Sequence, residues 1–410
     1  MKRVVVTGLG CITPVGNDAD AAWQSLIAGI HGFDAITKFN ASDLQVKIAA
    51  EVKDFNPEKY IEKPEIKKTD LFAQYAIAAA AQAVGESGIV GRVDAKRFGV
   101  YVGSGIGGIF TTITETEKMF NKGPRRISPF FIPMMIGNIA SALIAMKYNA
   151  QGPNLPVISA CATATHAIGE AFRAIKFGYA DAIVTGGAEA TINPLAMGGF
   201  INCMALSDTN DPGNSSIPFD KRRNGFVMGE GAGIIVLEEY EHALKRNAKI
   251  YCEIAGYGNT CDAHHITAPH PEAVGSIEMI RLALEESGLT ADEKLYINAH
   301  GTSTPLNDKT ETLAIKAVFG ELAYKIPVSS TKSMTGHMLG AAGGVEAIAS
   351  IKTLETGIIP PTIGYKEPDP DCDLDYVPNT ARKADINKAL SISLGFGGHN
   401  AGILFCKLNA

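Results

Sequence analysis

Two stretches, one in the middle of the chain and one near its end, decide the fold. Residues 225–237 read GFVMGEGAGIIVL, and residues 395–405 read GFGGHNAGILF. Each is a Gly-Phe turn followed by an apolar run, which is typical of a buried strand. Their spacing is far longer than the ~20–50 residues of solenoid repeats. The sequence therefore predicts a duplicated α/β unit, with an N-terminal half at residues 1–250 and a C-terminal half at residues 251–410.

Short runs of β-forming residues alternate with longer helical patterns along the chain. The predicted strands are Val4–Thr7, Gly99–Gly103, Val157–Ser159, Ala182–Thr185, Ile234–Leu237, Tyr251–Ile254, Leu295–Asn298, Val328–Ser330, Leu390–Leu394 and Gly402–Cys406. The predicted helices are Leu71–Ser87, Thr163–Phe177, Ser276–Ser287, Lys309–Phe319 and Gly344–Thr356. This alternation indicates α/β layers with largely buried strands.

The composition is that of a globular protein, with 46% hydrophobic and 20% charged residues among 410. The length exceeds the ~250–300 residues that one hydrophobic core usually serves, which agrees with two halves. The net charge of −6 argues against nucleic acid as a partner.

The longest apolar stretch, Phe130–Met146, is interrupted by Pro133 and Asn138 and is shorter than the ~20 residues of a membrane span. We therefore expect a buried or interface helix there, and no membrane partner. The seven cysteines are odd in number, no two form a close metal-binding pair, and no export signal is apparent. These features predict a reduced, cytoplasmic compartment and no metal site.

A candidate nucleophile lies where the predicted strand Val157–Ser159 leads into the predicted helix Thr163–Phe177. Cys161 is therefore expected at a helix N-terminus, where unpaired N–H groups and the positive end of the helix dipole lie. Such a position lowers the pKa of a thiol, and the thiolate is the nucleophile. The alternative is a buried structural cysteine, which is the commoner role of a lone cysteine.

Two histidines follow predicted strands in matching contexts. His300 comes after Leu295–Asn298, and His337 lies between Val328–Ser330 and a predicted helix. Sites in α/β proteins favour the carboxyl ends of strands, and two neutral imidazoles there could each donate an N–H to an enolate or oxyanion. A structural role for each histidine is the alternative. A zinc site made with Cys161 is a further alternative, but no fourth ligand is evident.

Other polar residues accompany these histidines. Lys332 and Glu346 flank His337 and form either an orienting ion pair or ordinary surface charges. Thr302 and Thr304 offer hydroxyls near His300, which could bind an amide-rich substrate arm or cap a turn.

Two glycine-rich turns invite functional interpretations. In the turn at residues 395–398, Phe396 could gate a pocket and present its backbone N–H as an oxyanion donor. A simple β-turn is the alternative. Residues 103–108 match G-x-G-x-x-G, but no acidic residue follows at the end of a second strand, so we expect no dinucleotide cofactor.

Taken together, these motifs resemble the β-ketoacyl synthase family, which has the thiolase-type fold. The resemblance covers essentially the whole chain and rests on residues 4–10, the Cys161 segment, and residues 218–231, 300–305, 332–344 and 395–400. It implies an α/β fold of five layers, α-β-α-β-α, built from two duplicated halves, and a homodimer. It also implies a triad of Cys161, His300 and His337, supported by Lys332 and Glu346, with Phe396 as the gate whose N–H joins that of Cys161 in the oxyanion hole.

Within the family, three places resemble the bacterial synthase II class. Ile106 stands where the synthase I class tends to have glycine, and Asn307-Asp308 and His399-Asn400 also fit class II. By the same resemblance, Ile106, Phe131 and Phe200 would line the acyl pocket, and Phe131 would act across the dimer.

The resemblance implies an elongating condensing enzyme of type II fatty-acid synthesis. Its reaction would be a decarboxylative Claisen condensation of an acyl-enzyme thioester with malonyl-acyl carrier protein, without a cofactor. The acidic carrier protein would be the partner, and the candidate docking cations are Lys63, Lys67, Lys68, Arg125 and Arg126. A solvated face is the alternative for each cation, and Met204 occupies a position that is often basic in relatives.

Three competing functions share parts of this pattern. A degradative thiolase would be expected to carry a second cysteine in the late glycine-rich loop, where this chain has Phe396. A polyketide-type ketosynthase subunit would share the triad. A non-catalytic chain-length partner would tend to lack the thiol, so Cys161 argues against it.

Overall fold

The computed structural model describes residues 1–408, in which nine strands form one mixed sheet of order β4-β5-β6-β1-β7-β13-β12-β8-β9. Their bounds are β1 Val4–Ile12, β4 Phe98–Gly103, β5 Ala182–Glu189, β6 Gly231–Glu239, β7 Cys252–Cys261, β8 Leu295–Asn298, β9 Val328–Ser329, β12 Lys388–Gly395 and β13 His399–Cys406. Two small strand pairs lie outside it, β2 Asp34–Ala35 with β3 Ile48–Ala49, and β10 Ile358–Ile359 with β11 Arg382–Lys383.

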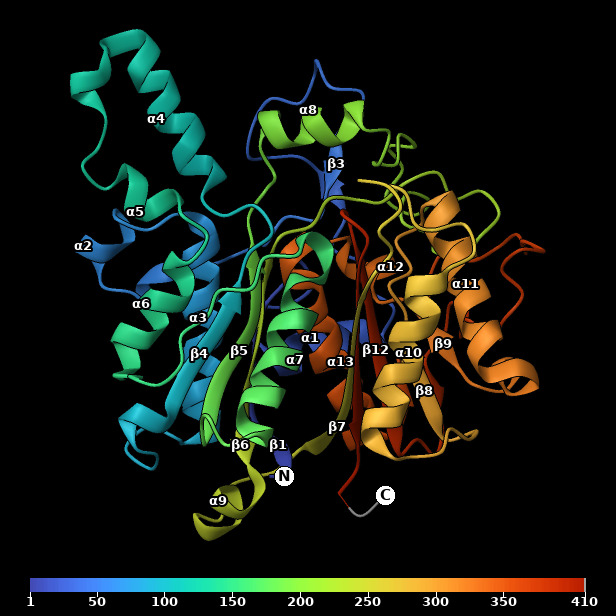
Figure 1. Cartoon of the computed structure of the whole chain (residues 1–410). Coiled ribbons are helices and arrows are strands. Elements are labelled where there is room, and N and C mark those ends of the chain that lie inside the picture. The colour runs from blue at the N-terminus through green and yellow to red at the C-terminus, as the bar shows by residue number, and fades with distance from the viewer. Residues whose placement is uncertain (409–410) are drawn as a thin grey trace.

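Helices form an outer layer on each half of the sheet and a central layer between the two halves (Figure 1). On one outer face lie α3 (Leu71–Ser87) and α6 (Ile139–Tyr148), and on the other lie α10 (Val274–Ser287) and α11 (Pro305–Phe319). Between the two parts of the sheet lie α7 (Thr163–Lys176) and α13 (Ala342–Thr356). The remaining helices are α1 Ala19–Ile27, α2 Lys63–Ile66, α4 Ile109–Lys122, α5 Phe131–Met135, α8 Pro194–Asn202, α9 Tyr240–Lys245 and α12 Lys332–Thr335.

The sheet repeats one pattern of four strands. In β4-β5-β6-β1 and again in β8-β12-β13-β7, the first pair is parallel and the next two pairs are antiparallel. The two patterns meet where β1 pairs with β7. The predicted five-layer α/β fold of duplicated halves is therefore confirmed. The division of the chain at residue 250 stays a prediction.

The same close packing recurs in both halves. A Cβ atom added at Gly8 or Gly10 of β1 would lie 2.1 Å from a backbone oxygen of α3. Cβ atoms at Gly256 and Gly258 of β7 would lie 2.0 and 1.8 Å from backbone oxygens of α10. Only glycine allows a helix to approach a strand so closely.

The central helices connect the two halves. Thr165 of α7 shares a 2.7 Å hydrogen bond with Ser393 of β12, although the two belong to different halves. On α13, a Cβ at Gly344 would lie 2.2 Å from the backbone oxygen of Gly233 in β6. Each central helix therefore packs against strands of both halves.

Two predictions of elements were wrong. Val157–Ser159 is not a strand, because the chain leaves its contact with β4 after Leu155 and turns at Ala160, which has a φ of +51°. Phe130–Met146 is not one helix, because Ile136 is extended and separates α5 from α6. Within residues 1–408, no helix combines the length and apolar character that crossing a bilayer requires.

Candidate active site

Cys161 lies in a short 3₁₀ turn, Ala160–Ala162, that leads directly into α7. The side chain is buried, and the backbone N–H groups of Cys161 and Phe396 both point at its sulfur. The turn after β12 presses against this segment, since a Cβ added at Gly395 would lie 3.3 Å from the nitrogen of Cys161. The two predicted oxyanion donors therefore meet at the nucleophile.

Both predicted histidines face the same space. His300 follows β8, and His337 lies just after α12. Their ring centroids are 5.3 Å apart, with the ring planes nearly perpendicular at 86°. Together with Cys161 and Phe396, they line a cavity of about 410 Å³.

The zinc alternative finds no support in this arrangement. In the part of the chain that the structure describes, no three His, Cys, Asp or Glu side chains gather closely enough to hold a metal ion. The side chains of Cys161, His300 and His337 instead surround a space that a substrate can enter.

Burial controls the charge of both imidazoles. It lowers the pKa of His300 and of His337 well below the usual value, and the nearby Lys332 ammonium lowers both further. Both rings are therefore neutral at pH 7, and each can donate one N–H or accept one proton.

The same burial acts against the expectation for Cys161. Burial raises the pKa of the Cys161 thiol to about 12, with a smaller rise from Glu189, while Lys332 and the N–H groups of Phe396 and Cys161 lower it. The prediction that the helix end ionises this thiol is wrong for the resting site, because desolvation of the thiolate outweighs the attraction of the nearby donors. A base must accept the proton as the sulfur attacks, and a neutral imidazole in the cavity can do so.

Lys332 and Glu346 form a buried ion pair. The Lys332 Nζ atom also lies 3.4 Å from Nδ1 of His300. The orienting interpretation of these two residues therefore fits the geometry, and the surface interpretation does not.

Aromatic rings and glycine turns close the cavity on one side. Phe200 of α8 and Phe396 both line it, with ring centroids 6.4 Å apart. The backbone beyond Phe396 has positive φ at Gly397 and Gly398, of 89° and 79°. The N–H of Gly397 donates to the oxygen of Ile266, so the gate turn is tied to the loop after β7.

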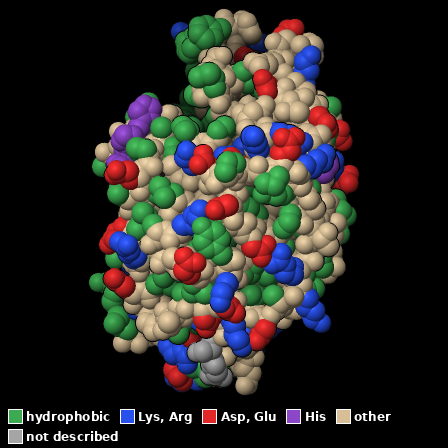
Figure 2. All heavy atoms as spheres, turned by 90° about the vertical axis from the view of Figure 1, so that its right-hand side faces the viewer, with side chains coloured by type: hydrophobic (Ala, Val, Ile, Leu, Met, Phe, Trp, Pro, Cys, Tyr) green, Lys and Arg blue, Asp and Glu red, His purple; other side chains and the backbone are tan. Residues whose placement is uncertain are grey.

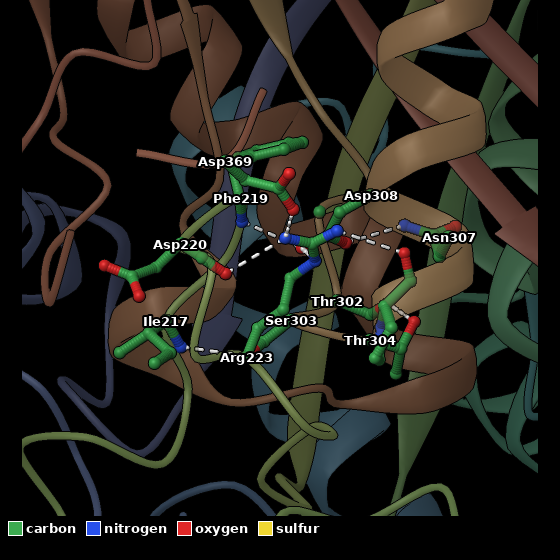
Figure 3. Close-up of polar contacts among 12 residues, drawn as sticks. Ile217, Phe219, Asp220, Arg223, Thr302, Ser303, Thr304, Asn307, Asp308 and Asp369 are labelled. Carbon is green, nitrogen blue, oxygen red and sulfur yellow. Dashed lines mark hydrogen bonds and ion pairs between the residues drawn. The ribbon is translucent and has the colours of Figure 1, made fainter. Parts of the chain in front are cut away.

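Thr302 and Thr304 line the cavity, and their hydroxyl oxygens are 2.9 Å apart. A buried arginine, Arg223, holds the loop that carries them (Figure 3). Its guanidinium donates to Oδ2 of Asp369 at 2.5 Å and to the backbone oxygen of Pro305 at 3.1 Å. The backbone that follows Thr304 is therefore held in place by Arg223.

Two predicted pocket residues lie outside the cavity around Cys161. Ile106 is 43% exposed in the loop after β4, and Phe131 is half-buried at the start of α5. The two segments are in contact, since the N–H of Gly108 donates to the oxygen of Met135. A single chain thus leaves this part of the predicted pocket open.

The predicted docking cations come from two neighbouring segments. Lys63, Lys67 and Lys68 lie on and just after α2, and the Nζ atom of Lys68 is 5.5 Å from the ring centroid of Phe130. Arg125 and Arg126 precede that ring in a 3₁₀ turn, Pro124–Arg126. Glu58 pairs with Lys63 and Glu65 pairs with Lys68.

Two buried residues that sequence reasoning missed support the catalytic segments. His166 shares a 2.7 Å hydrogen bond with Oγ of Ser159, and burial lowers the pKa of His166 to about 4. The carboxylate of Glu311 accepts hydrogen bonds from the N–H groups of His300 and Gly301, and burial raises the pKa of Glu311 to about 7. Both lie inside helices, α7 and α11, and neither has a spacing in the sequence that marks its role.

A thiol that can hold an acyl group, placed beside donors for an oxyanion and for an enolate, equips a molecule for carbon–carbon condensation through an acyl-enzyme. This geometry fits the class of condensing acyltransferases.

Comparison with known proteins identifies the family. Residues 1–243 match the model of the beta-ketoacyl synthase N-terminal domain, and residues 251–366 match that of the C-terminal domain. The chain is 51% identical to 3-oxoacyl-[acyl-carrier-protein] synthase 2 of Synechocystis over 99% of this chain and 98% of the relative. It is 48% identical to the synthase 2 of Staphylococcus aureus over 100% and 99%. The chain belongs to the β-ketoacyl synthase family.

A solved structure shares the whole fold. It is the type II polyketide ketosynthase of the AntDE:AntF complex with its acyl-carrier protein, with a TM-score of 0.90 and 33% identity over 99% of this chain and 100% of that one. The relatives of synthase 2 type make the present chain an elongating condensing enzyme of type II fatty-acid synthesis, an acyltransferase.

Proposed function

We propose that Cys161 carries the growing acyl chain, and that His300 and His337 bind the thioester oxygen of the malonyl group as carbon dioxide leaves. The observation that supports this assignment is the convergence of all three side chains on one cavity, with the N–H groups of Cys161 and Phe396 directed at the sulfur.

In the first half-reaction, the sulfur of Cys161 attacks the acyl thioester delivered by the carrier. Its proton passes to a neutral imidazole and then to the sulfur of the departing carrier arm. The developing oxyanion accepts hydrogen bonds from the backbone N–H groups of Cys161 and Phe396. One C–S bond forms, one breaks, and the carrier leaves as a free thiol.

In the second half-reaction, malonyl carrier occupies the cavity. When carbon dioxide leaves, the electron pair of the broken C–C bond stays on the malonyl group and forms an enolate. His300 and His337 stabilise this enolate by donating hydrogen bonds from their N–H groups. The buried ion pair of Lys332 and Glu346 orients His300. The enolate carbon attacks the acyl-Cys161 carbonyl, the C–S bond breaks, and the thiolate takes up a proton.

Two substitutions test these roles. Cys161→Ala should abolish transfer of a radiolabelled acyl group to the protein. His300→Ala should retain that transfer but slow the release of carbon dioxide from malonyl carrier by about 10²-fold or more, because one enolate donor is lost. Elongation at the wild-type rate by Cys161→Ala, or equal loss of both half-reactions in His300→Ala, would contradict the assignment.

We propose acyl carrier protein as the partner that delivers both substrates. The solved ketosynthase of 33% identity was captured with an acyl-carrier protein, and we assign the cavity-lining hydroxyls of Thr302 and Thr304 to binding the carrier arm. The candidate docking cations lie around α2 and residues 125–126. The face covered by α10 and α11 carries basic and acidic side chains interspersed (Figure 2).

The docking surface can be tested at Lys67, which has no ion-pair partner in residues 1–408, unlike Lys63 and Lys68. Lys67→Glu should raise the KM for malonyl carrier about fivefold at low salt and less at high salt. Lys96→Glu, on an exposed lysine before β4, is the matched control. An unchanged KM at low salt for Lys67→Glu would place the docking surface elsewhere.

We further propose a homodimer in which a second copy completes the acyl pocket. Four apolar side chains near Phe131 are exposed: Ile132, Met146, Leu155 and Ile158, at 57, 68, 48 and 58%. They lie on and beside α5, α6 and the edge strand β4, and an apolar surface of this kind is typical of an interface. Phe131 of each copy would then reach the pocket of the other.

A cytoplasmic location is proposed as well, since a reducing compartment keeps the Cys161 thiol free.

A further inference from the structure

Glu189 is a fully buried carboxylate that the mechanism above does not use. It is the last residue of β5, pairs with Gly231 of β6, and has no exposed surface. Within residues 1–408 it forms no salt bridge, and burial raises the pKa of Glu189 to about 7 although its hydrogen bonds act to lower it. An unpaired carboxylate in a protein interior is retained only where several donors stabilise it.

Four donors from two separate loops converge on this carboxylate. Oε1 accepts the hydroxyl of Ser104 at 2.8 Å and the N–H of Ile106 at 3.2 Å. Oε2 accepts the N–H of Gly105 at 2.8 Å and the N–H of Gly340 at 3.0 Å. The G-x-G-x-x-G loop at residues 103–108 therefore directs its amide groups at a carboxylate of the same chain.

The two loops carry different parts of the site. The first contains Ile106, a proposed acyl-pocket residue. The second follows His337 and leads into α13, which carries Glu346. Their backbones touch, since a Cβ added at Gly340 would lie 2.4 Å from the nitrogen of Gly105. Glu189 also lies close enough to Cys161 to influence its charge.

We propose that Glu189 is a positioning residue that fixes Ile106 relative to Cys161 and His337, and thereby sets the selectivity of the enzyme for acyl-chain length. This proposal rests on the proposed function, in which Ile106 lines the acyl pocket. Since Ile106 lies outside the cavity around Cys161, we expect long acyl chains to reach it and short ones not to. The carboxylate matters because it accepts from both loops at once.

The test is Glu189→Gln in the full-length enzyme. A glutamine side chain keeps the size but directs an NH₂ group at backbone donors, so at least one loop loses its partner. The ratio of kcat/KM for dodecanoyl over butanoyl carrier should fall about tenfold, mostly through KM for the long primer, which corresponds to the loss of roughly one hydrogen bond to a charged group. Acylation of Cys161 by the butanoyl primer should stay within about threefold of wild type.

A matched control separates this effect from simple loss of stability. Glu238 is equally buried at the opposite end of the β5–β6 pair, where Arg246 and His242 bind its carboxylate. Glu238→Gln should lower the melting temperature without changing the chain-length ratio. Should Glu189→Gln fail to fold, Ser104→Ala removes one of the four hydrogen bonds without changing the charge, and it also removes the acceptor of the Gly107 N–H in the same loop. It should shift the ratio in the same direction by a smaller factor.

The outcomes distinguish this proposal from the one on which it rests. If Ile106→Ala changes the chain-length ratio but Glu189→Gln and Ser104→Ala do not, Ile106 lines the pocket and the positioning role of Glu189 is wrong. If Ile106→Ala changes nothing, the pocket assignment itself fails. An equal change of the ratio in Glu238→Gln would also overturn the proposal, since any buried glutamate would then have the same effect.

Discussion

Cys161 is subject to two opposing influences. Its place before α7 and the N–H groups of Cys161 and Phe396 favour the thiolate, while burial and the nearby Glu189 favour the thiol. The thiol form prevails, so the proton must leave during the attack. The sequence could point to Cys161 through its turn, but it could not reveal this balance, because the burial comes from segments of both halves that close over the sulfur.

The raised pKa of Cys161, about 12, predicts how the resting enzyme reacts with iodoacetamide. Below its pKa a thiol gains about tenfold in thiolate fraction for each pH unit. The rate at Cys161 should therefore rise through pH 7 to 10 without a plateau. Mass spectrometry of labelled peptides would follow it, with the exposed Cys203 as an internal reference. A plateau near pH 7 would show that the thiol is already ionised.

At the scale of single elements, apolar periodicity predicted most of the fold. Leu71–Ser87 and Leu295–Asn298 have the bounds expected for α3 and β8, because each has a clear pattern and clear ends. The prediction of a strand at Val157–Ser159 was wrong, although the composition of this segment favours one. A strand also needs a hydrogen-bonded neighbour, and within residues 1–408 the segment 157–159 pairs with none.

The glycines of β1 and α3 give a matched pair of substitutions. Gly10→Ala should destabilise the fold by about 3 kcal/mol, because the new methyl group would meet a backbone oxygen that cannot move aside. Gly85→Ala should instead stabilise it by about 1 kcal/mol, since alanine is the better helix former. Gly85 is exposed on α3 with nothing within 4 Å of an added Cβ. Urea unfolding would measure both, and equal effects would contradict the close approach of α3 to β1.

At the scale of the whole molecule, the sequence indicated a duplicated unit. It also predicted that Cys161, His300 and His337 share one site, and in the structure all three line one cavity. It did not indicate that β1 and β7 join both halves into one sheet. Nor did it reveal Glu189, because a glutamate at the end of a strand has no distinctive spacing. Such features depend on contacts between distant segments, and one sequence does not record them.

The proposed homodimer predicts the mass of the protein in solution. Light scattering should give twice the chain mass of 43.3 kDa. Ile132→Glu combined with Ile158→Glu should shift the particle to a single chain, because two charges would have to be buried in the interface. Leu244→Glu, on the exposed helix α9, is the control. A wild-type monomer, or a double variant that stays paired, would argue against this surface.

The way α7 and α13 pack has a consequence for how the protein denatures. Thr165 binds Ser393, and Gly344 touches Gly233, so each central helix would lose part of its support if the other half came apart. Two family models match residues 1–243 and 251–366, yet neither half of the sheet keeps its central layer fully packed without the other half. A calorimetric scan of the protomer should therefore show one cooperative heat-absorption peak, with no plateau for a half-melted species.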